Sequence, residues 1–217
     1  MFERLFGSGK GSTLVEAAFE DVSTMLRQSA KMLDLSLAAL LDNEKLEVDL
    51  EEMDDVVDDG ERMVRRTILQ HLTVNPQQDL VASLILVSMV QDAERIGDFS
   101  RGLAELIDLA KSPREGKYAD QLRSLASRLR PMFEVCEEAF RQDDSEKASI
   151  VVARHGELKP ALVEYTKEIA ASDLGADMAI VYATGARILR RISAHLSNIA
   201  STVVQPYDRI RHGDEDL

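Results

Sequence analysis

Apolar residues along this chain recur at three- and four-residue steps, and no useful stretch alternates with the period of a β-strand. The three- and four-residue steps are the period of an amphipathic α-helix, and six segments show it. These segments cover residues 13–42, 44–72, 77–111, 118–142, 145–172 and 174–204. Gly and Pro are sparse and fall mostly between them. The pattern therefore predicts an all-α protein.

The two halves of the chain resemble each other. A shift of 100 residues aligns Met-Leu-Asp-Leu at 32–35 with Met-Phe-Glu-Val at 132–135. A shift of 96 aligns Arg-Ile-Gly at 95–97 with Arg-Ile-Ser at 191–193. Two matches in the same order predict two tandem three-helix bundles related by an internal repeat. We expect the following segments: a flexible leader at 1–12, the first repeat at 13–112, the second repeat at 117–204 and a charged tail at 205–217.

Two pairs of acidic residues on consecutive predicted helices share one spacing. Glu94 and Asp98 lie four residues apart in the segment Asp-Ala-Glu-Arg-Ile-Gly-Asp, and Asp54 and Asp58 repeat that spacing one helix earlier. Residues four apart share a helix face. A single such pair most often only solvates a helix surface. Two pairs on neighbouring helices of a bundle can converge on a hard or borderline metal ion through carboxylate oxygens, so we predict a metal site.

Asp92 differs from its acidic neighbours in its position on the helix. Ile96, Phe99 and Leu103 define the core stripe of that helix, and the later acidic pair lies roughly opposite. Asp92 falls on the core stripe. A buried carboxylate needs a partner, so we predict that an arginine, or hydroxyl and backbone donors, hold Asp92.

Composition excludes several classes of function. The net charge of −13 argues against a nucleic-acid-binding surface, which needs clustered Lys and Arg. Cys136 is the sole cysteine, so an internal disulfide is impossible and a cytoplasmic location is expected. No segment has the about 18 apolar residues that a membrane span needs, so the chain is not expected to be membrane-embedded. Nothing in the sequence suggests a catalytic site that combines a nucleophile, a base and an orienting group, so we do not expect an enzyme.

The Glu-Arg-Ile-Gly-Asp segment at 94–98, the Asp54-x-x-x-Asp58 pair and the tandem three-helix repeat resemble the PhoU family of phosphate-uptake regulators. In that family such carboxylate motifs bind multinuclear metal clusters. The resemblance implies a non-enzymatic cytosolic regulator that acts through protein–protein contacts and binds iron, zinc or manganese. It implies a phosphate transporter component or a phosphate-sensing kinase as partner, peripheral docking on a membrane complex, and a homodimer.

The second half departs from the motif. Arg154 and Leu158 take the positions of the first acidic pair, and Arg190 and Ala194 take those of the second. Cations cannot replace carboxylates as metal ligands. We therefore expect one metal-binding face, in the first repeat. The arginine face could meet an acidic partner or a phosphate, or it could be an ordinary solvent-facing surface.

Two other functions compete with a metal-binding regulator. A ferritin-like carboxylate-bridged metal protein needs Glu-x-x-His pairs on facing helices, and no histidine of this sequence has a glutamate three residues before it. A plain helical scaffold without metal fits the same periodicity. Metal analysis of protein purified without chelators distinguishes the scaffold from the regulator.

Overall fold

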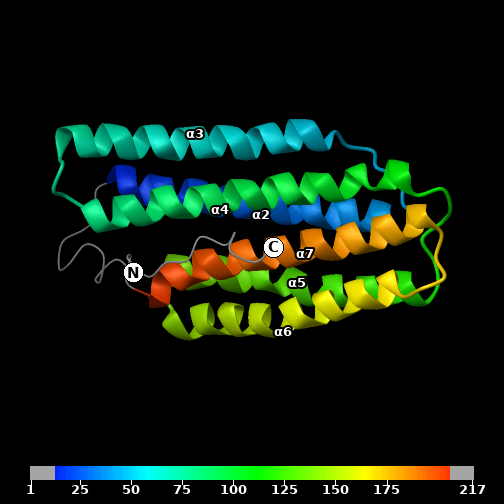
Figure 1. Ribbon diagram of the computed structural model, residues 1–217. Coiled ribbons are helices and arrows are strands. Elements are labelled where there is room, and N and C mark those ends of the chain that lie inside the picture. The colour runs from blue at the N-terminus through cyan, green and yellow to red at the C-terminus, as the bar shows by residue number, and fades with distance from the viewer. Residues whose placement is uncertain (1–12, 206–217) are drawn as a thin grey trace.

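The computed structural model describes residues 13–205 and is built of helices, as the periodicity predicted (Figure 1). The elements are α2 (Thr13–Leu41), α3 (Leu50–Val74), α4 (Leu80–Glu105), the 3-10 helix η1 (Ile107–Leu109), α5 (Lys117–Gln142), α6 (Ser145–Ala170) and α7 (Ala176–Val204). Over the described residues there is no β-strand. The predicted all-α class is confirmed.

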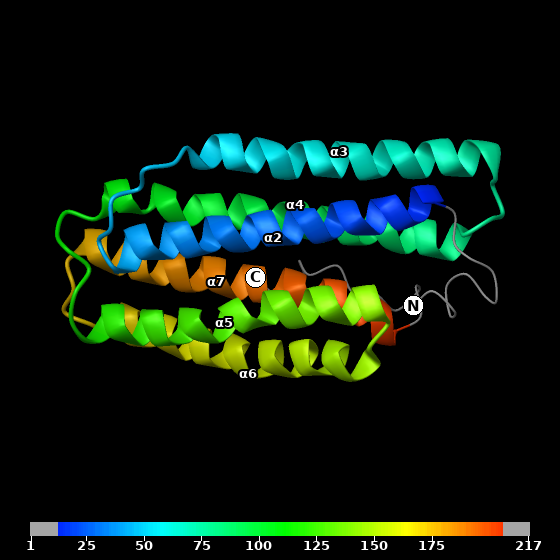
Figure 2. The ribbon, with the colours of Figure 1, turned by 180° about the vertical axis from the view of Figure 1, so that it is seen from behind.

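The helices form two three-helix bundles that lie side by side. α2, α3 and α4 pack on one another, and so do α5, α6 and α7. The bundles meet where α4 packs against α7 and α2 against α5. α3 and α6 lie at opposite outer edges of the molecule (Figures 1 and 2). The inner helices of each repeat therefore carry the contact between repeats, and each outer helix has one face toward solvent.

The internal repeat is visible in the backbone as well as in the sequence. Asn43 and Asp143 follow the first helix of each repeat, and both adopt the left-handed conformation, with φ of 57° and 56°. Asn and Asp tolerate that conformation better than other residues with a side chain. They are related by the 100-residue shift that aligns the sequences. Leu80 and Ala176, which begin α4 and α7, are related by the 96-residue shift.

Three helix ends differ from the sequence prediction by three residues or more. α3 begins at Leu50 rather than at 44, because Oδ1 of Asp49 accepts hydrogen bonds from the backbone N–H of Glu51 (2.8 Å) and of Glu52 (3.3 Å). α4 begins at Leu80 rather than at 77, after Asp79 in a left-handed conformation. It ends at Glu105 rather than at 111, where the chain tightens into η1.

Gly97 sets the spacing between helices in the first repeat. A Cβ at this position would lie 3.1 Å from Oδ1 of Asp54, 3.1 Å from Cγ1 of Val57 and 3.4 Å from Oγ of Ser29. Ser29 and Val57 are fully buried, so α2, α3 and α4 approach one another closely at this residue. The absence of a side chain therefore brings the backbone of α4 against the Asp54 carboxylate.

Candidate metal centre

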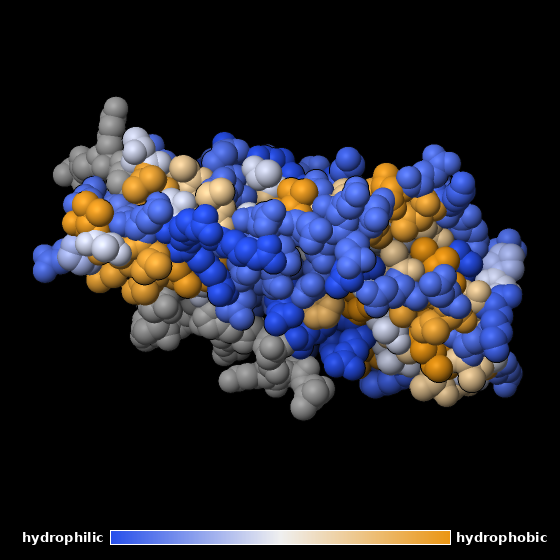
Figure 3. Space-filling model, turned by 90° about the horizontal axis from the view of Figure 1, so that it is seen from above, coloured by the Kyte–Doolittle hydropathy of each residue, from blue (hydrophilic) through white to orange (hydrophobic). Residues whose placement is uncertain are grey.

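The four predicted ligands lie together on the face shared by α3 and α4. Asp54 and Asp58 come from α3, and Glu94 and Asp98 from α4, which packs against it. Asp54 is 8% exposed, while the other three are half-buried. Viewed from the α3 side, the middle of the molecule is broadly hydrophilic and apolar side chains gather toward both ends (Figure 3). The helix packing places the two acidic pairs on neighbouring helices, and their convergence on a metal ion stays a prediction.

The pKa of Glu94 responds to the neighbouring acids. Burial, reinforced by repulsion from Asp98, raises the pKa of Glu94 to about 7. The attraction of Arg95 opposes this rise, and repulsion from Glu61 and Asp58 adds to it. Glu61 was not predicted as a site residue, although it follows Asp58 by about one helical turn. Burial is the main cause of the raised pKa, and repulsion between neighbouring carboxylates adds to it.

The pKa of Asp54 is also raised, and its arginine partner lies closer than that of Glu94. Burial raises its pKa, the guanidinium of Arg101 opposes the rise, and repulsion from Asp98 and Asp58 adds to it. Nε of Arg101 lies 2.7 Å from Oδ2 of Asp54, and Nη2 lies 3.9 Å from Oδ1 of Asp98. Arg101 of α4 therefore links its own helix to Asp54 of α3 and contributes a positive charge beside two of the four acids.

The remaining acids have guanidinium partners at the surface. Nη2 of Arg62 lies 3.3 Å from Oδ2 of Asp58, and Nη1 of Arg95 lies 3.1 Å from Oδ2 of Asp98. Over residues 13–205, no three His, Cys, Asp or Glu side chains are grouped as a metal site. The donor set has the chemistry that a divalent or ferric ion requires, because all four are carboxylates. To coordinate one ion, the four side chains must turn away from these arginines.

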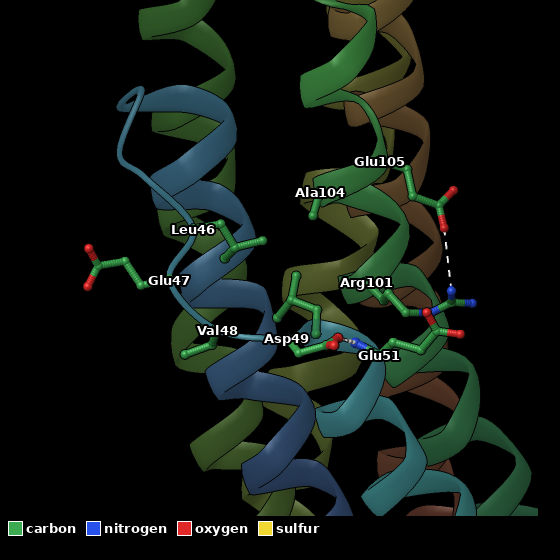
Figure 4. A pocket seen from close by; sticks show the side chains of 9 residues that line it. Leu46, Glu47, Val48, Asp49, Glu51, Arg101, Ala104 and Glu105 are labelled. Atoms are coloured by element: carbon green, nitrogen blue, oxygen red, sulfur yellow. Dashed lines mark hydrogen bonds and ion pairs between the residues drawn. The ribbon is translucent and has the colours of Figure 1, made fainter.

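A groove of about 570 Å³ adjoins this face (Figure 4). Its sides are Leu46 and Val48 from the loop before α3, and Ala104 from α4. Arg101 and Glu105 lie at its edge, with Nη1 of Arg101 3.5 Å from Oε1 of Glu105. The guanidinium of Arg101 is therefore shared between Asp54 on the acidic face and the rim of this groove.

Asp92 is buried, as its helical phase predicted, at 5% exposure. Oδ1 accepts a hydrogen bond from Nδ2 of Asn198 (3.0 Å) and lies 2.7 Å from Nδ1 of His195. The prediction was a partner of the arginine, hydroxyl or backbone kind, and the two contacts to Oδ1 come instead from a histidine and an amide of α7. Phe99 stacks on the His195 ring at a centroid distance of 5.6 Å. The Asp92 carboxylate therefore joins α4 of the first repeat to α7 of the second.

The matching face of the second repeat has opposite chemistry. Leu158, at the position of Asp58, is buried in the core. His155 uses Nδ1 to contact Oγ of Ser193 at 2.9 Å, and Ser193 stands where the first repeat has Gly97. Arg154 and Arg190 are half-buried on α6 and α7. The acidic pairs of the first repeat thus have no acidic counterparts at the aligned positions of α6 and α7.

None of the described helices combines the length and the apolar character that a membrane span would require.

Comparison with known proteins gives a consistent result. A family model described as the PhoU domain matches residues 22–107. The "Phosphate-specific transport system accessory protein PhoU homolog 1" of Thermotoga maritima is 26% identical over an alignment of 197 residues, and the match covers 85% of this chain and 83% of that protein. The matched domain runs through α2, α3 and α4 and so contains both acidic pairs.

Two solved structures have the same fold. The crystal structure of the phosphate transport system regulatory protein PhoU from Streptococcus pneumoniae superposes with a TM-score of 0.78 and 20% identity, covering 88% of this chain and 93% of that one. The structure of PhoU from Pseudomonas aeruginosa gives 0.76 and 21%, covering 88% and 95%. At these identities the likeness concerns the arrangement of the helices.

Proposed function

We propose that this chain, which carries a PhoU domain and the fold of PhoU proteins, is a non-enzymatic regulator of phosphate transport. The resemblance to the PhoU family, predicted from motifs that include Glu94–Asp98, is confirmed by the match to the PhoU domain. The observation that carries the function is the match to the PhoU domain, together with similarity over 85% of this chain to a phosphate transport accessory protein. The partner would be a component of a phosphate transporter or a phosphate-sensing kinase.

The acidic face of α3 and α4 is proposed to bind a metal ion. Asp54, Asp58, Glu94 and Asp98 would hold iron, zinc or manganese through carboxylate oxygens. A bound cation would oppose the repulsion between carboxylates that, together with burial, raises the pKa of Asp54 and of Glu94. Arg101 already neutralises part of this charge, so Arg101 and a metal ion would compete for the carboxylate of Asp54.

A role without catalysis is supported by the state of the one thiol in the sequence. Cys136 is fully buried and donates to the carbonyl of Leu196 at 3.4 Å, and burial raises its pKa. A thiol in that state is a poor nucleophile. A free cysteine also suits the reducing cytoplasm, where we place the protein, docked peripherally on a membrane complex.

A homodimer is supported by exposed apolar side chains at the start of α4. Leu80, Val81, Leu84 and Val87 recur at the spacing of one helix face, and each is exposed. Sedimentation equilibrium tests this proposal. The parent should have the mass of a dimer, and Leu84→Glu should lower it to that of a monomer because a charge cannot be buried unpaired. A monomeric parent would exclude the dimer.

The proposed function is tested in cells of the source organism grown with ample phosphate. Deletion of the gene should change the rate of phosphate uptake, and the parent chain supplied in trans should restore it. Complementation with Glu94→Ala/Asp98→Ala then distinguishes a contribution of the metal site to phosphate uptake from a contribution of the fold, because this double variant is expected to keep its helices. Unchanged uptake in the deletion strain would refute the proposed function.

A further inference from the structure

A second groove, of about 370 Å³, lies between α6 and α7 of the second repeat. Its apolar lining comes from Leu162 and Val163 on α6 and from Ala183 and Ala186 on α7. One turn away on α7, Ile180 is 54% exposed. Leu162 and Ala186 are buried, so the apolar strip that reaches solvent consists of Val163 and Ala183, with Thr166 and Thr184 also lining the groove.

Basic side chains border this apolar strip. Arg187 and Arg190 come from α7 and Lys167 from α6. Within the described part of the chain, neither arginine has a carboxylate in ion-pair distance, unlike Arg62, which pairs with its helix neighbours. Nζ of Lys167 lies 3.1 Å from Oε2 of Glu164 on its own helix, and such exposed pairs contribute little. In a chain of net charge −13, the groove retains positive charge that the residues at 13–205 do not neutralise.

The repeat relates this groove to the acidic face. Arg190 of α7 stands where Glu94 stands on α4, and Ala194 stands where Asp98 does. At one of these two positions a guanidinium group replaces a carboxylate, and at the other a methyl group replaces it. The second repeat therefore lacks the acidic pair of α4 and carries a cation at one of its positions.

We propose that the α6–α7 groove docks an acidic amphipathic segment of a partner protein. Carboxylates of the segment would pair with Arg187 and Arg190, whose planar guanidinium groups suit carboxylates. Apolar side chains on the same face of the segment would lie on Val163 and Ala183. A small inorganic anion would use the arginines and leave the apolar lining uncovered, so a segment with both chemistries fits the groove better. This site goes beyond the proposed function and uses none of the acidic residues of the first repeat.

A designed probe tests this site on the full chain. The probe is a fluorescein-labelled helical peptide with Leu on one stripe and Glu flanking it, and its twin carries Lys in place of Glu. Fluorescence anisotropy should show binding of the acidic peptide alone, weakened by salt because exposed charges are screened. R187E/R190E should weaken binding by about tenfold or more, the loss expected when a charge pair of about 1.4 kcal/mol or more is removed.

Matched variants make this result specific to the groove. K31E/R66E changes the net charge by the same amount at exposed cations of α2 and α3, and should leave binding within about twofold. Ala183→Phe fills the apolar lining without altering charge, and should weaken binding. Circular dichroism checks each fold, and R187Q/R190Q replaces the charge reversal if that variant does not fold.

Three results would overturn the proposal. The first is absence of binding by the parent, or equal loss in K31E/R66E, which would mark a response to net charge alone. The second is displacement of the peptide by inorganic phosphate as effectively as by unlabelled peptide, together with unchanged binding in Ala183→Phe, which would mark a simple anion site. The third is a lower sedimentation mass for R187E/R190E than for the parent, which would show that a second copy of this chain occupies the groove.

Discussion

Oδ1 of Asp92 and Nδ1 of His195 lie 2.7 Å apart, although 103 residues separate them in the chain. Both side chains are buried, and the contact joins α4 of the first repeat to α7 of the second. Hydrophobic packing between bundles tolerates sliding, whereas a buried polar contact requires one alignment of the two helices. This contact therefore fixes how the two repeats sit against each other.

Removal of the Asp92 carboxylate should destabilise the protein. Asp92→Ala leaves the buried Nδ2 of Asn198 without its acceptor, and the expected loss in free energy of unfolding is about 1–3 kcal/mol. Urea unfolding followed by circular dichroism measures it. A double-mutant cycle with His195→Ala should give a coupling energy of about 0.5–3 kcal/mol. A variant as stable as the parent would show that this contact contributes nothing to folding.

The ionisation of Glu94 should give the metal-free protein a pH-dependent stability. The pKa of Glu94 is raised from 4.5 to about 7, so between these values the folded state holds the proton more tightly than the unfolded state. The contribution of Glu94 to stability is therefore full below pH 4.5 and is lost as the pH rises to about 7. Glu94→Gln should remove this loss and gain stability relative to the parent above that range. Unfolding of chelator-treated protein at several pH values measures the difference, and a constant difference across pH would contradict it.

The proposed metal site predicts the metal content of the purified protein. Parent protein purified without chelators should carry iron, zinc or manganese in one site region per chain, and Glu94→Ala/Asp98→Ala should lose it with unchanged helicity. Glu134→Ala/Glu138→Ala is the matched control, because it removes two exposed acids at the same spacing from α5. Inductively coupled plasma mass spectrometry measures the metal content. Equal metal content in the two double variants would refute the assignment, and two equivalent regions per chain would refute the asymmetry between the repeats.

Alanine at Gly97 should lower the stability of the protein, whereas alanine at Gly156 should raise it. An alanine Cβ at Gly97 would lie 3.1 Å from both Asp54 and Val57, so it must push apart side chains that Arg101 and the core hold in place. We expect a loss of about 1–3 kcal/mol from this overpacking. Gly156 on α6 has open space around it, so Gly156→Ala should gain about 0.5–1 kcal/mol from helix propensity. Thermal unfolding of both variants compares them, and stabilisation by Gly97→Ala would show that α3 and α4 can separate at no cost.

Helical periodicity predicted much of this fold and part of the site. The phase of α4 placed Asp92 in the core and the later acidic pair outside it, because a helix face is a property of the local sequence. The partners of Asp92 lie on another helix about 100 residues away, and periodicity does not reveal which helix faces which. Arg101 was missed for the same reason, since its contact with Asp54 depends on how α3 and α4 are rotated. The late start of α3 was missed because residues 44–49 have a helix-like composition, and the capping by Asp49 decides the boundary.

The loop before α3 has a consequence for the symmetry of the molecule. After Asn43 the chain runs without helix to Asp49, whereas after Asp143 the cap at Asp144 starts α6 at once. Equivalent stretches of the duplicated sequence are thus irregular in one bundle and helical in the other. The two repeats are thereby distinguishable at this end of the molecule, which two identical repeats would not be. A partner that recognises the irregular end has a single way to attach, and the second bundle offers it no equivalent surface.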